Sequence, residues 1–241
     1  GGALGSAFIP TFTGLLAKNE TDSAWRLASA LANTVTLTLS LLAALIALFA
    51  PQVVRFALAP GLSTNPELFS LTVSLLRIQL ISAVLFGLGG LIVGILNAHQ
   101  VFLVPALTPA VYQLGIIFGA IFLAPSMGIY GLAWGVVIGA GLYLLVLLTD
   151  HRPQTADDSY PVTRNSHPSS IVHRLSSFSL GLRDPNVRTV LLLMLPRLLG
   201  VAVVQLNFWV NTNLASNMEA GSVASLTYGF SLMLMAQAVI A

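Results

Sequence analysis

The chain has 241 residues, of which 56% are hydrophobic and only 7% carry a charged side chain. Soluble domains contain roughly 25% charged residues, so this composition excludes a soluble domain and indicates a polytopic membrane protein of the all-α class. The formal net charge of +2 is too small for a nucleic-acid-binding surface. Because the sequence has no cysteine, disulfides, thiolate metal sites and cysteine nucleophiles are excluded.

The strongest membrane signal is the stretch from Leu71 to Phe122, in which Arg77 is the only charged residue. It predicts two apolar helices joined by a polar turn at 97–100. The uncharged run continues to Thr149, and a bilayer-spanning helix needs about 20 apolar residues. The chain opens at Gly1 without an initiator Met, and we expect it to be a fragment.

In chain order, Gly1–Ala17 is predicted to be the end of a helix, and a charged loop follows at 18–26. Pro51 is expected to stop or kink the first complete span. The third span is expected to break at 124–128. The complete spans are predicted at Leu27–Phe49, Phe69–Leu96, Phe102–Leu123, Ile129–Leu148 and Val187–Leu214, with a truncated span at Val223–Ala241.

Residues 150–186 form the only long hydrophilic region and separate a first block of spans, 1–149, from a second block, 187–241. Apolar residues recur within it at helical spacing, namely Ile171, Leu175, Phe178 and Leu182. This pattern suits a helix lying in the membrane surface, and a disordered linker is an equally open interpretation. Asp184-Pro185 is predicted to begin the next helix as N-cap and first residue.

The basic residues predict the orientation. Alternating the connections between the two sides of the membrane places Lys18, Arg26, Arg152, Arg164, Arg174, Arg183 and Arg188 on one side and only Arg55 on the other. By the positive-inside rule, the 18–26 loop, the turn at 97–100 and the long hydrophilic region are cytoplasmic. The turns at Pro60, Pro125 and Glu219 then face outside.

The sequence contains no enzyme signature that we can identify, and its scattered histidines do not predict a metal or cofactor site. The most informative side chain is Arg197, which lies well inside a predicted span, where a charge is costly and usually faces a cavity, partner or substrate. Gln205 and Asn211 share its helical sector, which predicts a polar, substrate-binding wall. Alternatively, the Arg197 side chain extends to the lipid headgroups, and the side-chain amides of Gln205 and Asn211 hydrogen-bond to neighbouring helices. Arg77 is a weaker cavity candidate, with anchoring favoured.

Small residues predict helix packing, and prolines predict bends. Gly131, Gly135 and Gly139 form a stripe at four-residue spacing, and the pairs Gly90/Gly94 and Gly115/Gly119 have the same spacing. Pro105 and Pro109 are candidates for a hinge in an alternating-access cycle, and static kinks are an equally open interpretation.

Several motifs in this order resemble the MurJ (MviN) family of lipid II flippases, within the multidrug/oligosaccharidyl-lipid/polysaccharide (MOP) exporter superfamily. They are GALGSAFIP at 2–10, LAPG at 58–61, GILNA at 94–98, PALTP at 105–109, LRDP at 182–185, MLPR at 194–197, NTNLAS at 211–216 and GSV at 221–223. The resemblance implies a MATE-like transporter of fourteen helices in two lobes. This chain would run from the end of the second helix to the eighth.

The resemblance also implies a substrate and a location. Family members would move lipid II, a lipid-linked pyrophosphate, across the bacterial inner membrane for cell-wall synthesis, without a cofactor. Cationic cavity residues would meet the pyrophosphate, and membrane lipids and cell-wall synthesis proteins would be the other partners. Where many relatives carry Asp-Arg in the eighth helix, this chain has Phe230-Ser231. A drug/cation antiporter, a polysaccharide-lipid flippase and an inactive scaffold are therefore the alternatives.

Overall fold

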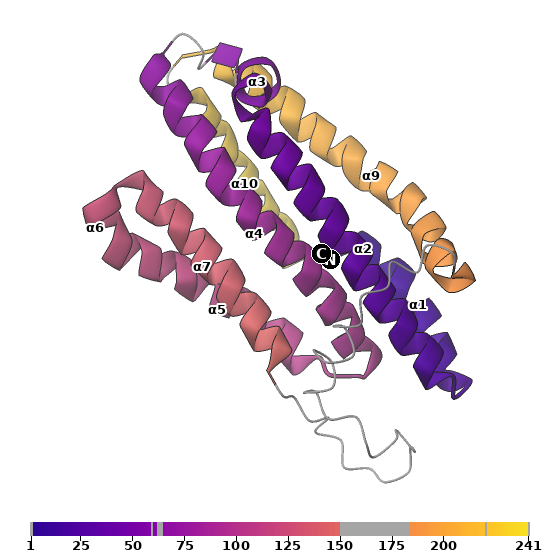
Figure 1. The fold of residues 1–241 in the computed structure, drawn as a ribbon. Coiled ribbons are helices and arrows are strands. Elements are labelled where there is room, and N and C mark those ends of the chain that lie inside the picture. The colour runs from indigo at the N-terminus through magenta and orange to yellow at the C-terminus, as the bar shows by residue number, and fades with distance from the viewer. Residues whose placement is uncertain (1, 59, 62–64, 150–183, 220, 241) are drawn as a thin grey trace. The chain divides into compact units, whose positions relative to one another are not determined.

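The computed structural model describes residues 2–58, 60–61, 65–149, 184–219 and 221–240 (Figure 1). In these ranges every regular element is a helix, which confirms the all-α prediction. The amphipathic helix proposed around Ile171–Leu182 lies outside the described residues.

Five helices in the described ranges are long and apolar enough to cross a bilayer, which confirms the five complete spans. They are α2 (Thr21–Leu48), α4 (Pro66–Ala98), the helix at Leu103–Met127, α7 (Ile129–Leu148) and α9 (Pro185–Ser216). The third of these comprises α5 (Leu103–Phe118), a π-helical turn η3 (Gly119–Leu123) and α6 (Ala124–Met127). The shorter α1 (Gly2–Ala17) and α10 (Ser222–Ile240) lie at the two ends of the chain.

Two predicted helix ends differ from the structure. Helix α2 begins at Thr21, so Asp22 and Arg26, predicted in a loop, lie in its first turns. Asp22 suits this position because a carboxylate there opposes the positive end of the helix dipole. The third span continues past Pro125, which lies in the first turn of α6. The break falls at Gly128, whose φ of 59° is left-handed.

The other helix ends follow from local chemistry. After Leu48, α2 gives way to the short α3 (Ala50–Val53) and η1 (Val54–Leu58), which confirms the stop at Pro51. Asp184 caps α9 by accepting a 2.8 Å hydrogen bond from the Asn186 amide, as predicted. Asn65 caps α4 in the same way, through the amides of Glu67 and Leu68.

Helices α1 and α4 both end in Schellman motifs without glycine. In α4 the Val101 amide donates to the Leu96 carbonyl and the Gln100 amide to that of Asn97, with Gln100 at φ 59°. In α1 the corresponding left-handed residue is Asn19.

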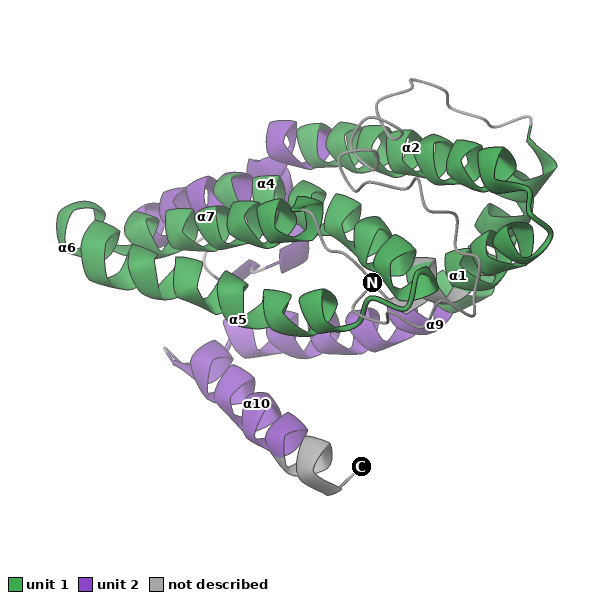
Figure 2. Ribbon diagram, turned by 90° about the horizontal axis from the view of Figure 1, so that it is seen from below, with its two compact units in different colours: residues 1–44, 78–198 green, residues 45–77, 199–241 purple. Residues whose placement is uncertain are grey.

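The described chain divides into two compact units (Figure 2). Unit 1 comprises residues 1–44 and 78–198, and unit 2 comprises residues 45–77 and 199–241. Helices α2, α4 and α9 each contribute to both units. The predicted boundaries at 149 and 187 concern lobes of a larger protein and remain a prediction.

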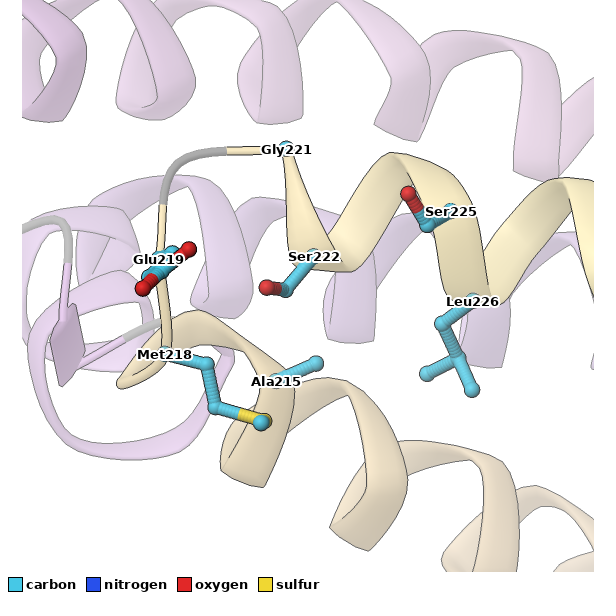
Figure 3. Close-up of a pocket in the computed structure, with 7 residues that line it drawn as sticks. All are labelled: Ala215, Met218, Glu219, Gly221, Ser222, Ser225 and Leu226. Atoms are coloured by element: carbon cyan, nitrogen blue, oxygen red, sulfur yellow. The ribbon is translucent and has the colours of Figure 1, made fainter.

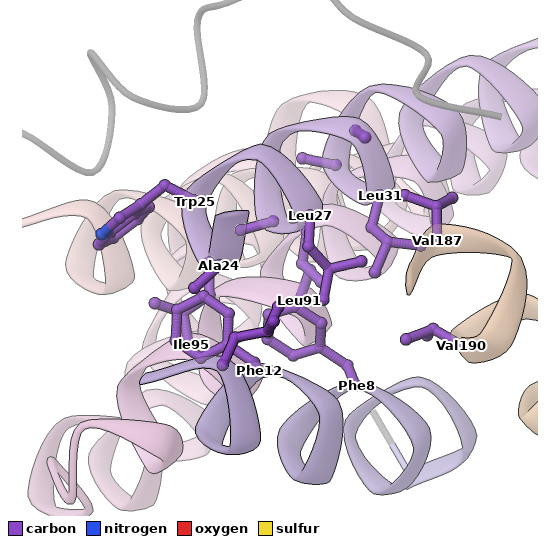
Figure 4. Close-up of a cluster of buried hydrophobic side chains, with 14 of the residues drawn as sticks. Phe8, Phe12, Ala24, Trp25, Leu27, Leu31, Leu91, Ile95, Val187 and Val190 are labelled. Carbon is purple, nitrogen blue, oxygen red and sulfur yellow. The ribbon is translucent and has the colours of Figure 1, made fainter. Parts of the chain in front are cut away.

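Unit 1 contains a core where α1, α2, α4 and the start of α9 meet (Figure 4). Its fully buried members include Phe8, Phe12, Leu27, Leu31, Leu91, Ile95, Val187 and Val190. Gly94 lies against this core, since a methyl group built on it would stand 3.1 Å from Phe8 Cδ1. Lipid tails are as apolar as leucine, so inside a bilayer such a cluster is stabilised mainly by close packing.

The glycine stripe of α7 packs directly against α5 and its continuation, which confirms that prediction and the one for Gly115 and Gly119. A methyl group on Gly135 would lie 2.8 Å from Gly119 Cα, and one on Gly139 would lie 2.5 Å from the Tyr112 carbonyl oxygen. The two backbones therefore approach more closely than any side chain would permit.

Unit 2 has a smaller core of Ala50, Val54 and Val73, with Leu58, Phe69 and Leu76 packed around it. It holds α3 and η1 against the beginning of α4. Phe208 of α9 and Phe230 of α10 pair with ring centroids 5.5 Å apart. Phe230 thus contributes to the packing of α10 against α9.

We expect Gly139→Ala to destabilise the protein by about 1–3 kcal/mol, because its methyl group would collide with the Tyr112 carbonyl and force α5 and α7 apart. Gly141→Ala is the matched control on the same helix. Nothing lies within 4 Å of a methyl group at Gly141, so helix propensity alone should make that change neutral or stabilising by up to about 1 kcal/mol. Thermal unfolding in detergent measures both. Equal melting temperatures for the two variants would show that the close contact at Gly139 does not contribute to stability.

Candidate functional site

Helix α9 carries the predicted polar wall, and the structure exposes Arg197, Gln205 and Asn211. Among the residues that the structure describes, the side chains of Arg197 and Gln205 form no hydrogen bond or ion pair. Asn211 Nδ2 donates to the Asn207 carbonyl at 3.0 Å and to Asn207 Oδ1 at 2.9 Å. Asn207 is thus a polar partner that the sequence analysis missed, although its four-residue spacing from Asn211 is visible in the sequence.

Arg197 stands just beyond a packed stretch of its helix. Val190 and Met194 pack into the core of unit 1, and Arg197 follows them by seven and three residues. These spacings keep all three side chains on one broad face of the helix. The face that is apolar and packed near the start of α9 therefore becomes cationic one turn later.

The asparagines of the NTNLAS motif point to different sides of α9. Asn211 and Asn213 are two residues apart, which corresponds to about 200° around a helix. Asn211 is exposed, whereas Asn213 Nδ2 donates to the Ala57 carbonyl at 2.9 Å. The motif combines an exposed amide with an amide that binds the protein's own backbone.

Arg77 has a defined contact inside unit 2. Its Nε donates to the carbonyl of Ala47, in the last turn of α2, at 3.0 Å. That carbonyl would ordinarily accept from the amide four residues later, but this residue is Pro51, which has no N–H. The Arg77 guanidinium thus replaces a donor that proline removes, and its assignment to anchoring or to a cavity stays a prediction.

The two candidate hinge prolines have a similar arrangement within α5. Pro105 is in the first turn, where a missing N–H costs no hydrogen bond. Pro109 leaves the Pro105 carbonyl without its usual donor, and the Thr108 hydroxyl donates to that carbonyl at 2.8 Å. Thr108 itself is only 1% exposed, and its hydroxyl gives the Pro105 carbonyl a donor that Pro109 cannot supply.

An open hollow of about 500 Å³ lies where α9 turns into α10 (Figure 3). Its lining includes Glu219, Ser222 and Ser225 beside Met218. It contains none of the predicted site residues. No group of three His, Asp or Glu side chains that could hold a metal ion occurs among the described residues.

The five helices long and apolar enough to span a bilayer, one of them carrying Arg197, define a multi-pass helical membrane protein. The family described as "Lipid II flippase MurJ" matches residues 1–241. The chain belongs to this family, which comprises transporters rather than enzymes and is located in the bacterial inner membrane.

Individual relatives agree with the family match. Lipid II flippase MurJ of Burkholderia cenocepacia is 31% identical over 234 residues, which cover 96% of this chain and 42% of that protein. The probable lipid II flippase MurJ of Rhizobium tropici is 28% identical over 94% of this chain and 40% of its own. The chain thus spans about two fifths of the length of these relatives.

A solved structure titled "Lipid II flippase MurJ, inward closed conformation" has the same fold, with a TM-score of 0.71. The match covers 97% of this chain and 44% of that one, at 24% identity. The MOP-type transporter fold predicted from the sequence is therefore confirmed for the described part of the chain.

We expect Arg77→Met to cost about 1 kcal/mol of stability, because it removes the donor to the Ala47 carbonyl. Pro51→Ala restores an amide at the position that normally serves that carbonyl. In the Pro51→Ala background, Arg77→Met should therefore cost clearly less. Thermal unfolding of the four proteins measures this coupling, and additive effects would refute the proposed replacement.

Thr108→Val should likewise destabilise the protein, by about 1 kcal/mol, because it leaves the partly buried Pro105 carbonyl without a donor. In a Pro109→Ala background, the restored amide should remove most of this cost. Ser126→Ala serves as the control, since the Ser126 hydroxyl donates to the Leu123 carbonyl at an exposed site. A Thr108→Val effect that is just as large in the Pro109→Ala background would mean that the hydroxyl has another role.

Proposed function

We propose that the protein to which this chain belongs flips lipid II, the lipid-linked peptidoglycan precursor, from the inner to the outer leaflet by alternating access. Family membership supports this activity, and so do the spanning helices with a cation within one of them. In this proposal residues 1–149 belong to the first lobe, 150–186 form a cytoplasmic loop, and 187–241 begin the second lobe. Membrane lipids and cell-wall synthesis proteins are the further partners that we propose.

The observation that carries the proposal is the position of the Arg197 guanidinium. Helix α9 has 32 residues, or about 48 Å at 1.5 Å per residue, against a hydrocarbon core of about 30 Å. If the excess is shared equally between both ends, Arg197 lies roughly 9 Å inside the hydrocarbon boundary. A cation at that depth needs a partner, and the described part of the chain contains none.

A pyrophosphate is a suitable partner for Arg197. The guanidinium is planar, carries a positive charge and presents several N–H donors in a fork that matches phosphate oxygens. We propose that Gln205 and Asn211 supply neutral amide contacts along the same helix. In this scheme Arg77 holds the end of α2 through its hydrogen bond to the Ala47 carbonyl. Pro105 and Pro109 form the hinge of α5 during the cycle, and the Thr108 hydroxyl donates to the carbonyl that Pro109 leaves without an amide donor.

Two other activities are less well supported. An antiporter coupled through a carboxylate would need an acidic residue within a span, and the acidic residues of the described helices lie at helix ends, at Asp22 and Glu67. An inactive relative would fit the replacement at Phe230-Ser231. Phe230 packs on Phe208, which explains its presence without excluding transport.

We expect the full-length protein to rescue growth of a bacterium depleted of MurJ, and Arg197→Ala to reduce its transport rate roughly 10–100-fold. This estimate corresponds to losing charged hydrogen bonds worth about 1.5–3 kcal/mol. Lipid II appearing in the outer leaflet, measured at equal expression, gives the rate. The matched control is Arg188→Ala, an exposed arginine in the first turn of the same helix, which should leave transport intact.

Arg197→Lys separates phosphate binding from an interaction with headgroups. A lysine extends to the headgroups as well as an arginine does, but it lacks the two-pronged donor geometry. Phosphate binding predicts a partial loss in Arg197→Lys. Full activity in that variant would assign Arg197 to membrane anchoring, and undiminished rescue by Arg197→Ala would remove it from the mechanism.

A further inference from the structure

One backbone carbonyl in unit 2 accepts hydrogen bonds from two distant side chains. Trp209 Nε1 donates to the Ala57 carbonyl at 2.6 Å, and Asn213 Nδ2 donates to the same oxygen at 2.9 Å. The two donors lie one turn apart on α9, and Ala57 lies in η1, 152 and 156 residues earlier. A carbonyl oxygen has two lone pairs, so these two donors fill its capacity.

A second contact lies beside these hydrogen bonds. A methyl group built on Gly61 would overlap the carbonyl of Ser216, at the end of α9, so the two backbones touch. Only glycine permits this approach. Ala57 and Gly61 therefore contact the last two turns of α9, Ala57 through the side chains of Trp209 and Asn213 and Gly61 through the backbone at Ser216.

Each end of this contact is held by its own helices. The core of Ala50, Val54 and Val73 ties η1 to the start of α4. Trp209 and Asn213 lie within the continuous helix α9, where their positions are set by the helix backbone. The contact consequently joins η1 and its packed neighbours to α9, and separating them means breaking both hydrogen bonds.

We propose that Trp209, Asn213 and the Ala57 carbonyl form an outer latch that holds the extracytoplasmic ends of the two lobes together during transport. This inference rests on the proposed function, because that proposal assigns Ala57 and α9 to different lobes and places the turns at Pro60 and Glu219 outside. With the latch closed, the outer side of the transport path is closed. Trp209 and Asn213 are positioning residues that do not contact the substrate.

The exposure of the donors explains why the contact is reversible. Trp209 is 37% exposed, and the Asn213 bond is only partly buried. Water is therefore available to replace both hydrogen bonds when the latch opens, which keeps the net cost of opening small. A fully buried pair would leave unsatisfied polar groups and favour one state permanently.

Paired spin labels across the latch test the proposal in the full-length protein, in a background without other cysteines. Phe56→Cys lies next to Ala57 and Met218→Cys follows the end of α9, and the native side chains are 73% and 70% exposed. We expect a short and a long distance population. Trp209→Phe together with Asn213→Leu removes both donors without adding a charge, and should raise the ratio of long to short distances roughly tenfold.

Thr212→Val is the matched control, because the Thr212 hydroxyl donates only within α9, to the Phe208 carbonyl at 2.9 Å. It should leave the distance ratio unchanged. If the double variant does not fold, Trp209→Phe and Asn213→Leu are measured singly, each with a smaller expected shift. Distance distributions identical to those of the parent protein in the folded variants would overturn the latch.

Growth rescue and lipid II transport separate the latch from the activity on which it rests. A shifted distance ratio in a protein that does not transport lipid II would support the latch and reject the flippase. Transport by the parent protein with an unshifted ratio in the variants would reject the latch alone. In a working flippase, the double variant should also lose transport, because its outer side no longer closes.

Discussion

A proline inside a membrane helix leaves the carbonyl four residues earlier without its amide donor, and lipid offers no replacement. Pro51 and Pro109 create this situation at Ala47 and Pro105, where the Arg77 guanidinium and the Thr108 hydroxyl act as donors. Helix ends leave carbonyls in the same condition. The end of η1 is such a place, and there the Ala57 carbonyl accepts from α9. At Ala47, Pro105 and Ala57, a side-chain donor thus serves a carbonyl that the helix backbone leaves without one.

The second constraint on the fold is close packing at glycines, where two helix backbones meet with no side chain between them. Glycines bring α5 and α7 together so closely that even a methyl group is excluded. The cluster around Phe8 and Phe12 joins four helices by filling the space between them instead. In both places the attraction comes from contact area, because apolar side chains gain little by leaving lipid for protein. Rigid helix groups of this kind are what an alternating-access transporter would move against one another.

The candidate site was only partly predictable. Arg197 was identified from the sequence because a charge within an apolar run can be recognised without knowing how the helix packs. The contacts of Asn207, Trp209 and Asn213 were not predicted. Polar and aromatic residues are common near the end of a span, and their spacing does not indicate which group they bind. Asn211 and Asn213 look equivalent in the motif, yet they lie on different sides of α9. The helical period separates their directions, but only the position of Ala57 gives one of them a hydrogen-bond partner.

The sequence by itself determined that the chain crosses the membrane, approximately where each span begins and ends, and which family it resembles. These properties depend on the length of apolar runs and on local capping groups such as Asp184, which act over a few residues. Tertiary structure decided which side chain serves which carbonyl and which glycines meet. The reason is the distance along the chain: Trp209 and Ala57 are 152 residues apart, and no local pattern specifies that they share a hydrogen bond.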